Sequence, residues 1–259
     1  MSGPAVEDAL KVSGLQKRFG GVVVANDMRL TIPRGRVTGI IGPNGAGKST
    51  LFNIIAGFVA ADAGYIELDG RDITHLPMYR RARLGVSRTW QHVRLFPSLS
   101  VFDNLLLGAR EYSGAGVMSA LFRPPWINRQ MKELGARADA LLLRIGLAHK
   151  RNDSTNTLSY GQQKRIGLAR ALMNDGPYLL LDEPLSGVDG KNYEIILDLI
   201  RQEVAGGRGI CVIEHNISFM TEVASDLLFL FNGQIEAHGP PREILADARI
   251  RRIYFGGET

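Results

Sequence analysis

The residues from Gly42 to Thr50 have the types and spacing that hold a chain of phosphates. They read Gly-Pro-Asn-Gly-Ala-Gly-Lys-Ser-Thr, which fits the pattern of Gly, four residues and Gly-Lys-Ser. Glycines let successive backbone N–H groups point at one anion, the lysine reaches the outer phosphates, and the serine hydroxyl ligates Mg²⁺. The predicted phosphate-binding residues are Gly42, Pro43, Asn44, Gly45, Ala46, Gly47, Lys48, Ser49 and Thr50.

The flanking segments are the elements that would position this loop. Residues 37–41 are short and apolar, as a buried parallel strand should be, and residues 51–57 have the pattern of an amphipathic helix. A loop between a strand and a helix N-terminus lies where the helix dipole attracts anions. These flanks favour a phosphate loop over a glycine-rich turn that carries a lysine by chance.

A second apolar strand, predicted over residues 178–182, ends in two acids, Asp182 and Glu183. In open parallel sheets, ligands bind beyond the carboxyl ends of the strands, which is where both side chains would lie. We expect Asp182 to hold Mg²⁺, directly or through water, and Glu183 to polarise the water that attacks a γ-phosphate. An Asp-Glu pair alone is weak evidence, but together with a phosphate loop it is strong.

Two further side chains follow predicted strands. Gln91 is expected to end a strand over residues 86–91, where its amide oxygen can ligate Mg²⁺ or the attacking water. His215 follows an apolar strand over residues 209–214 and can hydrogen-bond the γ-phosphate. The alternatives are a surface glutamine and a structural histidine. The predicted catalytic residues are therefore Glu183, His215 and Gln91, and the predicted metal ligands are Ser49, Gln91 and Asp182.

Composition limits the class of protein. The 259 residues are 45% hydrophobic and 22% charged, with a net charge of +5, as in an ordinary globular protein. The only cysteine, Cys211, lies in an apolar run and cannot form a disulfide within the chain. No apolar run approaches the length of a membrane span, so we expect any membrane role to be peripheral. A basic stripe with interleaved aromatics, typical of nucleic-acid binding, is missing from the sequence.

The remaining pattern predicts an α/β fold: a phosphate-loop NTPase core with a mixed or parallel sheet, an N-terminal antiparallel β region and an inserted α-helical subdomain. We divide the chain into 1–91 (core with phosphate loop), 92–174 (helical subdomain) and 175–259 (rest of the core). Gly70-Arg71 reads as a turn, residues 113–126 as a loop, and Asn232-Gly233 as a hairpin turn between the last strands. Helices are expected at 77–84, 101–109, 128–146, 158–174 and 192–204, and two short ones from residues 241 and 247.

The order of these motifs resembles the ATP-binding cassette ATPases over nearly the whole chain. The segment Leu-Ser-Tyr-Gly-Gln-Gln at residues 158–163 resembles the family's Leu-Ser-x-Gly-Gln signature, with Tyr160 where glycine is more usual. The resemblance implies ATP and Mg²⁺ as cofactors and two ATPs sandwiched between two subunits. In that arrangement Ser159, Gly161 and Gln162 of one subunit would face the phosphate loop of the other. Ser159 alone would read as a plain helix N-cap.

Two more roles are implied only by this resemblance. Phe19 matches the aromatic residue that stacks on adenine; the alternative is a turn aromatic packed on the core. Asp189 would lie on the loop that couples the two ATP sites.

A narrower resemblance points to the ATPase subunits of branched-chain amino-acid importers. It rests on residues 87–96, 101–107, 122–125 and 253–256, with Trp90 where phenylalanine is usual. It implies a peripheral subunit on the cytoplasmic face of the inner or plasma membrane. Its partners would be two membrane-spanning permease subunits, a second ATPase subunit (the same or a related chain) and, indirectly, an extracytoplasmic solute-binding protein. Residues 92–150 would dock the permease subunits.

Two alternatives remain. One is the ATPase of a lipid or lipopolysaccharide export system, which we expect to resemble the chain less between Gln91 and Ser159. The other is a soluble, non-transport cassette protein that acts on nucleic acid or ribosomes. Such proteins usually carry tandem cassettes or long coiled insertions, and this sequence has neither.

Overall fold

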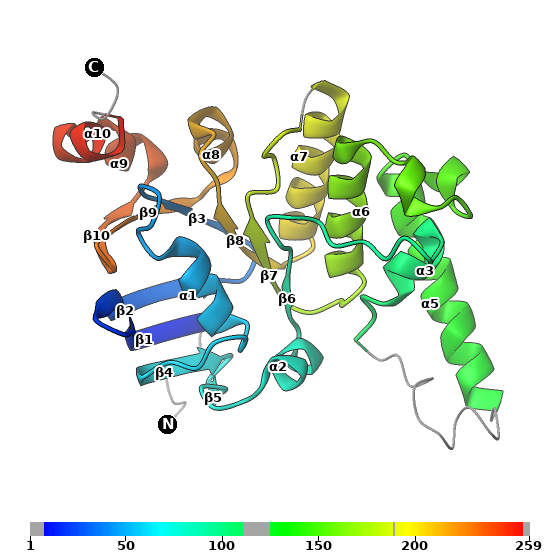
Figure 1. Cartoon of the computed structure of the whole chain (residues 1–259), viewed down its shortest axis with the longest axis horizontal. Coiled ribbons are helices and arrows are strands. Elements are labelled where there is room, and N and C mark those ends of the chain that lie inside the picture. The colour runs from blue at the N-terminus through cyan, green and yellow to red at the C-terminus, as the bar shows by residue number, and fades with distance from the viewer. Residues whose placement is uncertain (1–7, 111–124, 189, 256–259) are drawn as a thin grey trace, which may run out of the picture.

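The computed structural model describes residues 8–110, 125–188 and 190–255. Within these ranges the strands form two sheets, with helices packed against them and a group of helices set to one side (Figure 1). That group is formed by α3 (Val101–Leu106), α5 (Pro125–Arg144) and α6 (Tyr160–Leu172), and we call it the helical block.

The first sheet is antiparallel and has the order β2-β1-β4-β5. Its strands are β1 (Ala9–Phe19), β2 (Val22–Pro33), β4 (Ala63–Leu68) and β5 (Arg71–Asp72). Apolar side chains of β1 and β2, among them Leu15, Leu30 and Ile32, are buried while their neighbours in sequence reach solvent. This alternation is typical of a sheet that covers a core with one face.

The second sheet is mixed and has the order β10-β9-β3-β8-β7-β6. Its strands are β3 (Val37–Ile41), β6 (Val86–Arg88), β7 (Tyr178–Asp182), β8 (Gly209–Ile213), β9 (Asp226–Phe231) and β10 (Gln234–Gly239). β3, β7 and β8 run parallel. They are buried at every residue because helices or the other sheet cover both faces of the mixed sheet. Ile213 of β8 pairs with Ile40 of β3 and with Asp182 of β7, so the three strands end at one edge.

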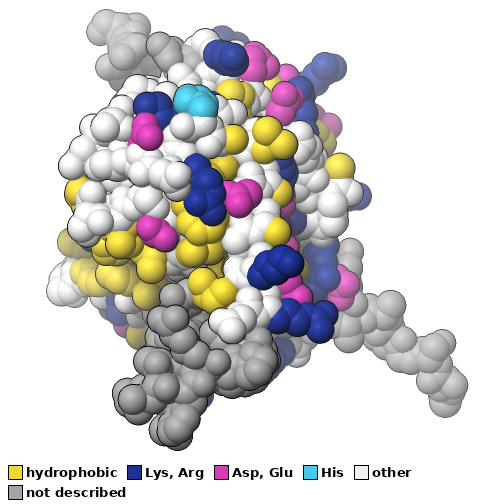
Figure 2. All heavy atoms as spheres, turned by 90° about the vertical axis from the view of Figure 1, so that its right-hand side faces the viewer, with side chains coloured by type: hydrophobic (Ala, Val, Ile, Leu, Met, Phe, Trp, Pro, Cys, Tyr) yellow, Lys and Arg dark blue, Asp and Glu magenta, His cyan; other side chains and the backbone are white. Residues whose placement is uncertain are grey.

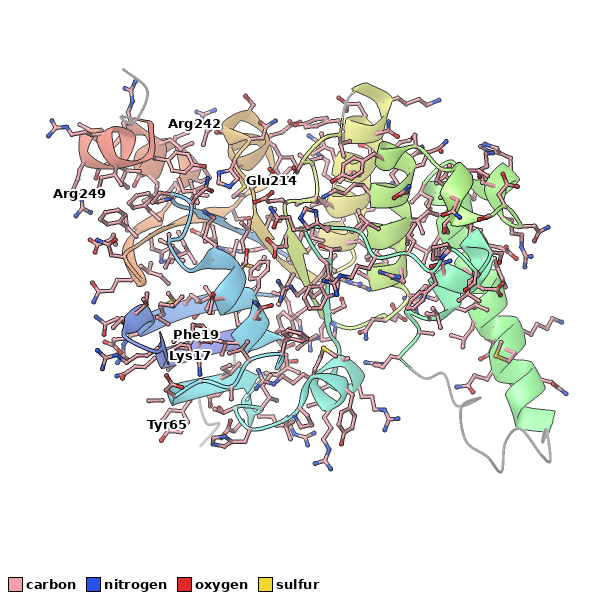
Figure 3. All side chains as sticks on the ribbon, viewed as in Figure 1. Lys17, Phe19, Tyr65, Glu214, Arg242 and Arg249 are labelled. Carbon is pink, nitrogen blue, oxygen red and sulfur yellow. The ribbon has the colours of Figure 1, made fainter. Side chains whose placement is uncertain are left out.

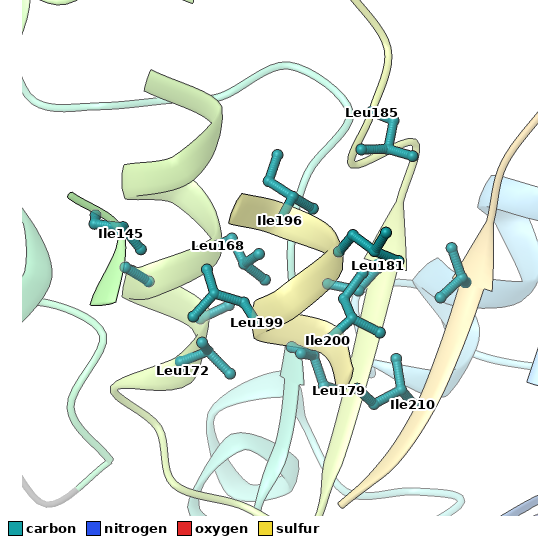
Figure 4. Packing of buried hydrophobic residues seen from close by; sticks show 14 of the residues in the cluster. Ile145, Leu168, Leu172, Leu179, Leu181, Leu185, Ile196, Leu199, Ile200 and Ile210 are labelled. Carbon is teal, nitrogen blue, oxygen red and sulfur yellow. The ribbon is translucent and has the colours of Figure 1, made fainter. Parts of the chain in front are cut away.

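The helices divide the apolar core into two clusters. α1 (Lys48–Ile55) packs between the two sheets through Leu51, Phe52, Ile54 and Ile55. The second cluster lies on the other face of the mixed sheet and joins the helical block to α7 (Gly190–Ala205). Figure 4 shows its centre, where side chains of α6, α7, β7 and β8 pack together. The other helices in the described ranges are α2 (Met78–Leu84), α8 (Ile217–Val223), α9 (Pro241–Ala246) and α10 (Ala248–Phe255), with 3₁₀ turns at Ala148–Lys150 and Thr155–Thr157.

The predicted fold class is confirmed: the structure has the antiparallel β region, the mixed sheet and the helical block. The turn at Asn232 and Gly233 is also confirmed, with φ of 47° and 74°, the left-handed pair that a tight hairpin needs. The division at residues 91 and 174 stays a prediction.

Four local predictions were wrong. The strand expected to reach Gln91 ends at Arg88, because Trp90 leaves the sheet to pack edge-on against Phe58, with ring centroids 5.4 Å apart. Arg71 forms the short strand β5 on β4, since the turn lies at Asp69-Gly70. α5 begins at Pro125, inside the predicted loop; proline suits the first turn of a helix.

The fourth was the omission of α8. Its start is set by Asn216, whose side chain accepts a hydrogen bond from the backbone N–H of Phe219, and it spans only residues Ile217–Val223. A helix of this length gives too few turns for a periodic pattern.

Several predictions fall outside the described residues. These are the loop over residues 113–124, the stretch around Phe122, the position of Asp189, and Gly256. Among the helices that the structure does describe, none has the length and apolar character to cross a membrane.

Candidate functional site

The predicted phosphate loop connects β3 to α1 at the carboxyl edge of the mixed sheet. Gly47 has a φ of 104°, and a Cβ there would lie 2.6 Å from the carbonyl oxygen of Val24, so only glycine fits. Asn44, Gly45 and Ser49 are exposed at the mouth of the loop, while Gly42, Ala46, Gly47 and Lys48 are buried and Pro43 and Thr50 are intermediate. The loop thus presents backbone and the Ser49 hydroxyl at the N-terminus of a helix.

The ammonium group of Lys48 is folded onto its own loop. Nζ donates to the carbonyl oxygens of Gly42, at 2.6 Å, and Pro43, at 3.0 Å. Burial lowers the pKa of Lys48, and the nearby carboxylates of Glu183 and Asp182 act in the opposite direction. The lysine therefore stands between the phosphate loop and the two acids at the end of β7.

Glu183 is the residue around which the other candidate groups gather. Its backbone is left-handed, with φ of 48°, and its N–H donates to the carbonyl oxygen of Ile213. Its Oε2 accepts a hydrogen bond from Nε2 of Gln91 at 2.8 Å, and its Oε1 lies 3.5 Å from Nε2 of His215. The structure thus brings Gln91, Glu183 and His215, the three predicted catalytic residues, into direct contact.

The loops that carry Glu183 and His215 are tied together by Glu214, at the end of β8 (Figure 3). Its carboxylate is 4% exposed and accepts backbone hydrogen bonds from Leu185, at 2.6 Å, and from His215, at 3.0 Å. Burial raises the pKa of Glu214, and these N–H groups oppose the rise. The bonds fix the spacing between the loops that carry Glu183 and His215.

The other side of the His215 ring is held by the C-terminal helix α10. Nδ1 of His215 lies 2.9 Å from Oη of Tyr254, and the two rings are parallel, with centroids 6.3 Å apart. The imidazole is therefore held between the hydroxyl of Tyr254 and the carboxylate of Glu183.

Asp182 ends β7 and lies deep in the site. Its Oδ2 is 2.9 Å from Nη2 of Arg88, and both side chains are almost fully buried. Its Oδ1 is buried and has no hydrogen-bond partner among the described residues. A buried carboxylate oxygen without a partner is what a divalent cation with oxygen ligands would complete, so the residues present fit Mg²⁺.

Ser159 of the signature segment, residues 158–163, is the N-cap of α6. Oγ of Ser159 accepts from the N–H of Gln162, and Oε1 of Gln162 accepts from the N–H of Ser159, which is a complete capping box. Gly161 lies against α7, where a Cβ would meet the side chain of Asn192 at 2.8 Å. Ser159 and Tyr160 are exposed. These residues contact α6 and its neighbours, and the structure does not bring them to the phosphate loop of the same chain.

Phe19 ends β1 on the antiparallel sheet, beside Lys17 (Figure 3). Its ring is 49% exposed, and Nζ of Lys17 lies 5.2 Å from the ring centroid. An aromatic ring packed on the core would be buried, so the alternative interpretation of Phe19 does not hold. The ring offers a face to a ligand.

Sequence reasoning missed Arg88, Lys164, Glu214 and Tyr254. Lys164 of α6 is 5% exposed, and its Nζ donates to the carbonyl oxygens of Gln91 and Glu183, both at 2.9 Å. It ties α6 to the segments that carry Gln91 and Glu183. A signal existed for Glu214, the charged residue within the apolar strand predicted over residues 209–214, because a buried charge needs a partner.

A cavity of about 610 Å³ lies between α2, β6 and the helical block. Apolar side chains such as Met78, Val93, Phe96 and Leu107 line it, and Arg88 and Asp182 also contribute to its wall. Asn104 is fully buried and holds the backbone of Phe96. Its Oδ1 accepts a hydrogen bond from the N–H of Phe96, and its Nδ2 donates to the carbonyl oxygen of Phe96. The Phe96 side chain remains 51% exposed.

Known proteins are similar to this chain in sequence. The ABC transporter family model matches residues 25–186. A probable ABC transporter ATP-binding protein of Azorhizobium caulinodans is 37% identical over 97% of this chain and 84% of that protein. The branched-chain amino acid transport ATP-binding protein BraF of Pseudomonas aeruginosa is 35% identical, over 95% of this chain and 97% of BraF. The lipopolysaccharide export ATP-binding protein LptB of Escherichia coli is 34% identical, with the same two coverages.

The solved structures agree. The ADP conformation of an ATP-binding cassette from an ABC transporter superposes with a TM-score of 0.82 at 32% identity, over 96% of this chain and 98% of that one. The family model covers more than half of the sequence, and the relatives named above cover almost all of it. This chain belongs to the ABC transporter family and is one of its nucleotide-binding ATPase cassettes.

Proposed function

We propose that this chain is the ATP-hydrolysing subunit of an importer for branched-chain or other hydrophobic amino acids. The observation that carries the proposal is the similarity to BraF, at 35% identity over 97% of that protein. The subunit would act from the cytoplasmic face of the membrane with two membrane-spanning permease subunits and a second ATPase subunit. An extracytoplasmic solute-binding protein would take part indirectly.

The residues around Glu183 support hydrolysis by a positioned water. Gln91 and His215 hold the Glu183 carboxylate from two sides, at 2.8 and 3.5 Å, so its lone pairs are fixed at the edge where the phosphate loop begins. A carboxylate held in this way can accept a proton from water as the water attacks the γ-phosphate. Lys48 and the loop backbone stabilise the charge on the phosphate oxygens. Ser49, Asp182 and Gln91 would hold Mg²⁺, which would neutralise further phosphate charge.

The apolar cavity beside the helical block supports docking of a permease subunit. Its wall includes Phe96, held outward by a fixed backbone, and also Asp182 of the candidate metal site. A partner segment seated in the cavity would therefore touch residues that adjoin the hydrolytic site. Adenine binding by Phe19 and binding of a second subunit's ATP by Ser159, Gly161 and Gln162 are part of the same proposal.

Export of a lipid is the second candidate, and the similarity to LptB supports it. The share of each chain that is aligned does not favour import over export, since it is the same for BraF and LptB. A nucleic-acid role has less support. On the face that Figure 2 shows, Lys and Arg side chains are interspersed with Asp and Glu and form no basic stripe.

Gene deletion in the source cells tests the proposal. Uptake of radiolabelled leucine, isoleucine and valine should fall and should return with the parent gene but not with Lys48→Ala. Uptake of a basic amino acid is the control. If the deletion leaves uptake normal and lipid accumulates in the inner membrane, the result would contradict the import function and support lipid export. Normal uptake and normal lipid distribution would contradict both transport functions.

A further inference from the structure

Arg88 joins three elements of the site. Its Nη2 lies 2.9 Å from Oδ2 of Asp182 on β7, and its Nη1 donates to Oδ1 of Asn53 on α1, the helix that follows the phosphate loop. Its guanidinium also lies over the ring of Trp90, 4.6 Å from the centroid. The Arg88 side chain is only 7% exposed, so its charge has been removed from water and depends on these partners.

The contact between Arg88 and Asp182 uses one oxygen of the carboxylate. Arginine and carboxylate groups frequently pair through two parallel hydrogen bonds, which would occupy both oxygens. Here Nε of Arg88 and Oδ1 of Asp182 are both buried and without a hydrogen-bond partner among the described residues. A pair that served only to neutralise two buried charges would gain from the second bond, so the single bond needs another explanation.

The single bond restrains Oδ2 of the carboxylate and leaves Oδ1 available. Asn53 holds the same guanidinium through Nη1, which anchors the arginine to α1 while Nη2 bonds Oδ2. This is the relation found around metal sites, where a second group orients a ligand without touching the metal.

We propose that Arg88 is a positioning residue for the cation site, holding Asp182 so that its Oδ1 is presented to Mg²⁺. The inference rests on the proposed use of Mg²⁺ with ATP. It predicts that Arg88 affects nucleotide binding only when Mg²⁺ is present. Residues that orient a metal ligand usually change metal affinity by about 10–100-fold when they are replaced.

The test compares the affinity of the purified chain for a non-hydrolysable ATP analogue in Mg²⁺ and in EDTA. The ratio of the two dissociation constants is the Mg²⁺ enhancement. Arg88→Met should lower this enhancement by at least about 10-fold, the lower end of that range, while the affinity in EDTA stays as in the parent. Arg88→Lys keeps a donor for Oδ2 and should retain more of the enhancement than Arg88→Met.

Arg81 provides the matched control. It is also buried, at 2% exposure, but its guanidinium donates to the backbone carbonyl oxygens of Ile54, Ile55, Thr74 and Leu76. Arg81→Met should lower the melting temperature and leave the Mg²⁺ enhancement unchanged. Asp182→Asn should remove the enhancement.

An enhancement equal to the parent's in folded Arg88→Met, or one in folded Arg88→Lys as low as that of Asp182→Asn, would overturn the inference about Arg88. If Asp182→Asn loses the enhancement in that case, the proposed magnesium site survives and only the role of Arg88 is lost. If the parent chain itself binds equally in Mg²⁺ and EDTA, the proposed use of Mg²⁺ fails, and the inference fails with it.

Discussion

Nε2 of Gln91 donates a hydrogen bond to Oε2 of Glu183 across 2.8 Å. The two residues come from segments far apart in sequence, one leading into the helical block and the other following β7. The bond means that a displacement of the Gln91 segment moves or releases the carboxylate of Glu183. Trp90 and Val93, close to Gln91 in sequence, line the cavity beside the helical block, so we expect a partner in the cavity to affect Glu183.

The first prediction concerns Glu183 itself. Glu183→Gln keeps the shape and can still bond Gln91, but it removes the base. ATP hydrolysis should fall by at least about 100-fold, the usual contribution of a general base, while ATP binding persists. Phosphate release and ATP affinity measured on the same preparation check this. Turnover near that of the parent would exclude Glu183 from the role of base.

The second prediction concerns the exposed ring of Phe19. If it stacks on adenine, Phe19→Ala should weaken ATP binding by about 1–3 kcal/mol, the scale of base–aromatic stacking. Binding of inorganic triphosphate should not change, because that ligand has no base. Tyr65→Ala is the matched control, since Tyr65 is another exposed aromatic of the same sheet, at 65% exposure. Equal losses for ATP and triphosphate would point to a folding role for Phe19.

The third prediction tests the cavity as the docking site of a permease subunit. Phe96→Glu places a charge on the apolar wall, which a buried contact would have to desolvate. The isolated chain should bind ATP as the parent does, but amino-acid uptake by cells carrying the variant should be lost. Leu143→Glu is the control, because Leu143 is 73% exposed and does not line the cavity. Normal uptake with Phe96→Glu would refute docking at this wall.

The fourth prediction is that each ATP site is shared between two subunits. Ser159 begins α6 at an exposed N-terminus, whose dipole and N–H groups can replace water around a γ-phosphate. ADP lacks that phosphate and should not hold two subunits together. We therefore expect a monomer alone or with ADP, and a dimer of Glu183→Gln with ATP, as measured by light scattering after size exclusion.

Adding Ser159→Arg to Glu183→Gln should abolish the ATP-dependent dimer and leave the ATP affinity of the monomer nearly intact. Ser100→Arg is the matched control, because Ser100 caps α3 in the same way, through a hydrogen bond from Asp103. A dimer that forms without ATP, or one that Ser159→Arg leaves as stable as its parent, would mean that the site is not shared in this way.

Much of this protein is determined by local sequence. β3 and β7 could be predicted to the residue, because strands covered on both faces are short, continuous apolar runs. The phosphate loop and the start of α6 at Ser159 follow from the conformational freedom of glycine and from capping by serine, which depend on neighbouring residues only. These features also sufficed to indicate the family.

The tertiary structure decided which side chains meet. The ion pair of Arg88 with Asp182 and the contact of His215 with Tyr254 join residues that lie far apart in the chain. No local periodicity encodes such pairs: the first depends on β6 lying beside β7, and the second on where α10 packs. Burial makes such contacts energetically important, because a charge removed from water is costly unless the fold places a compensating group next to it.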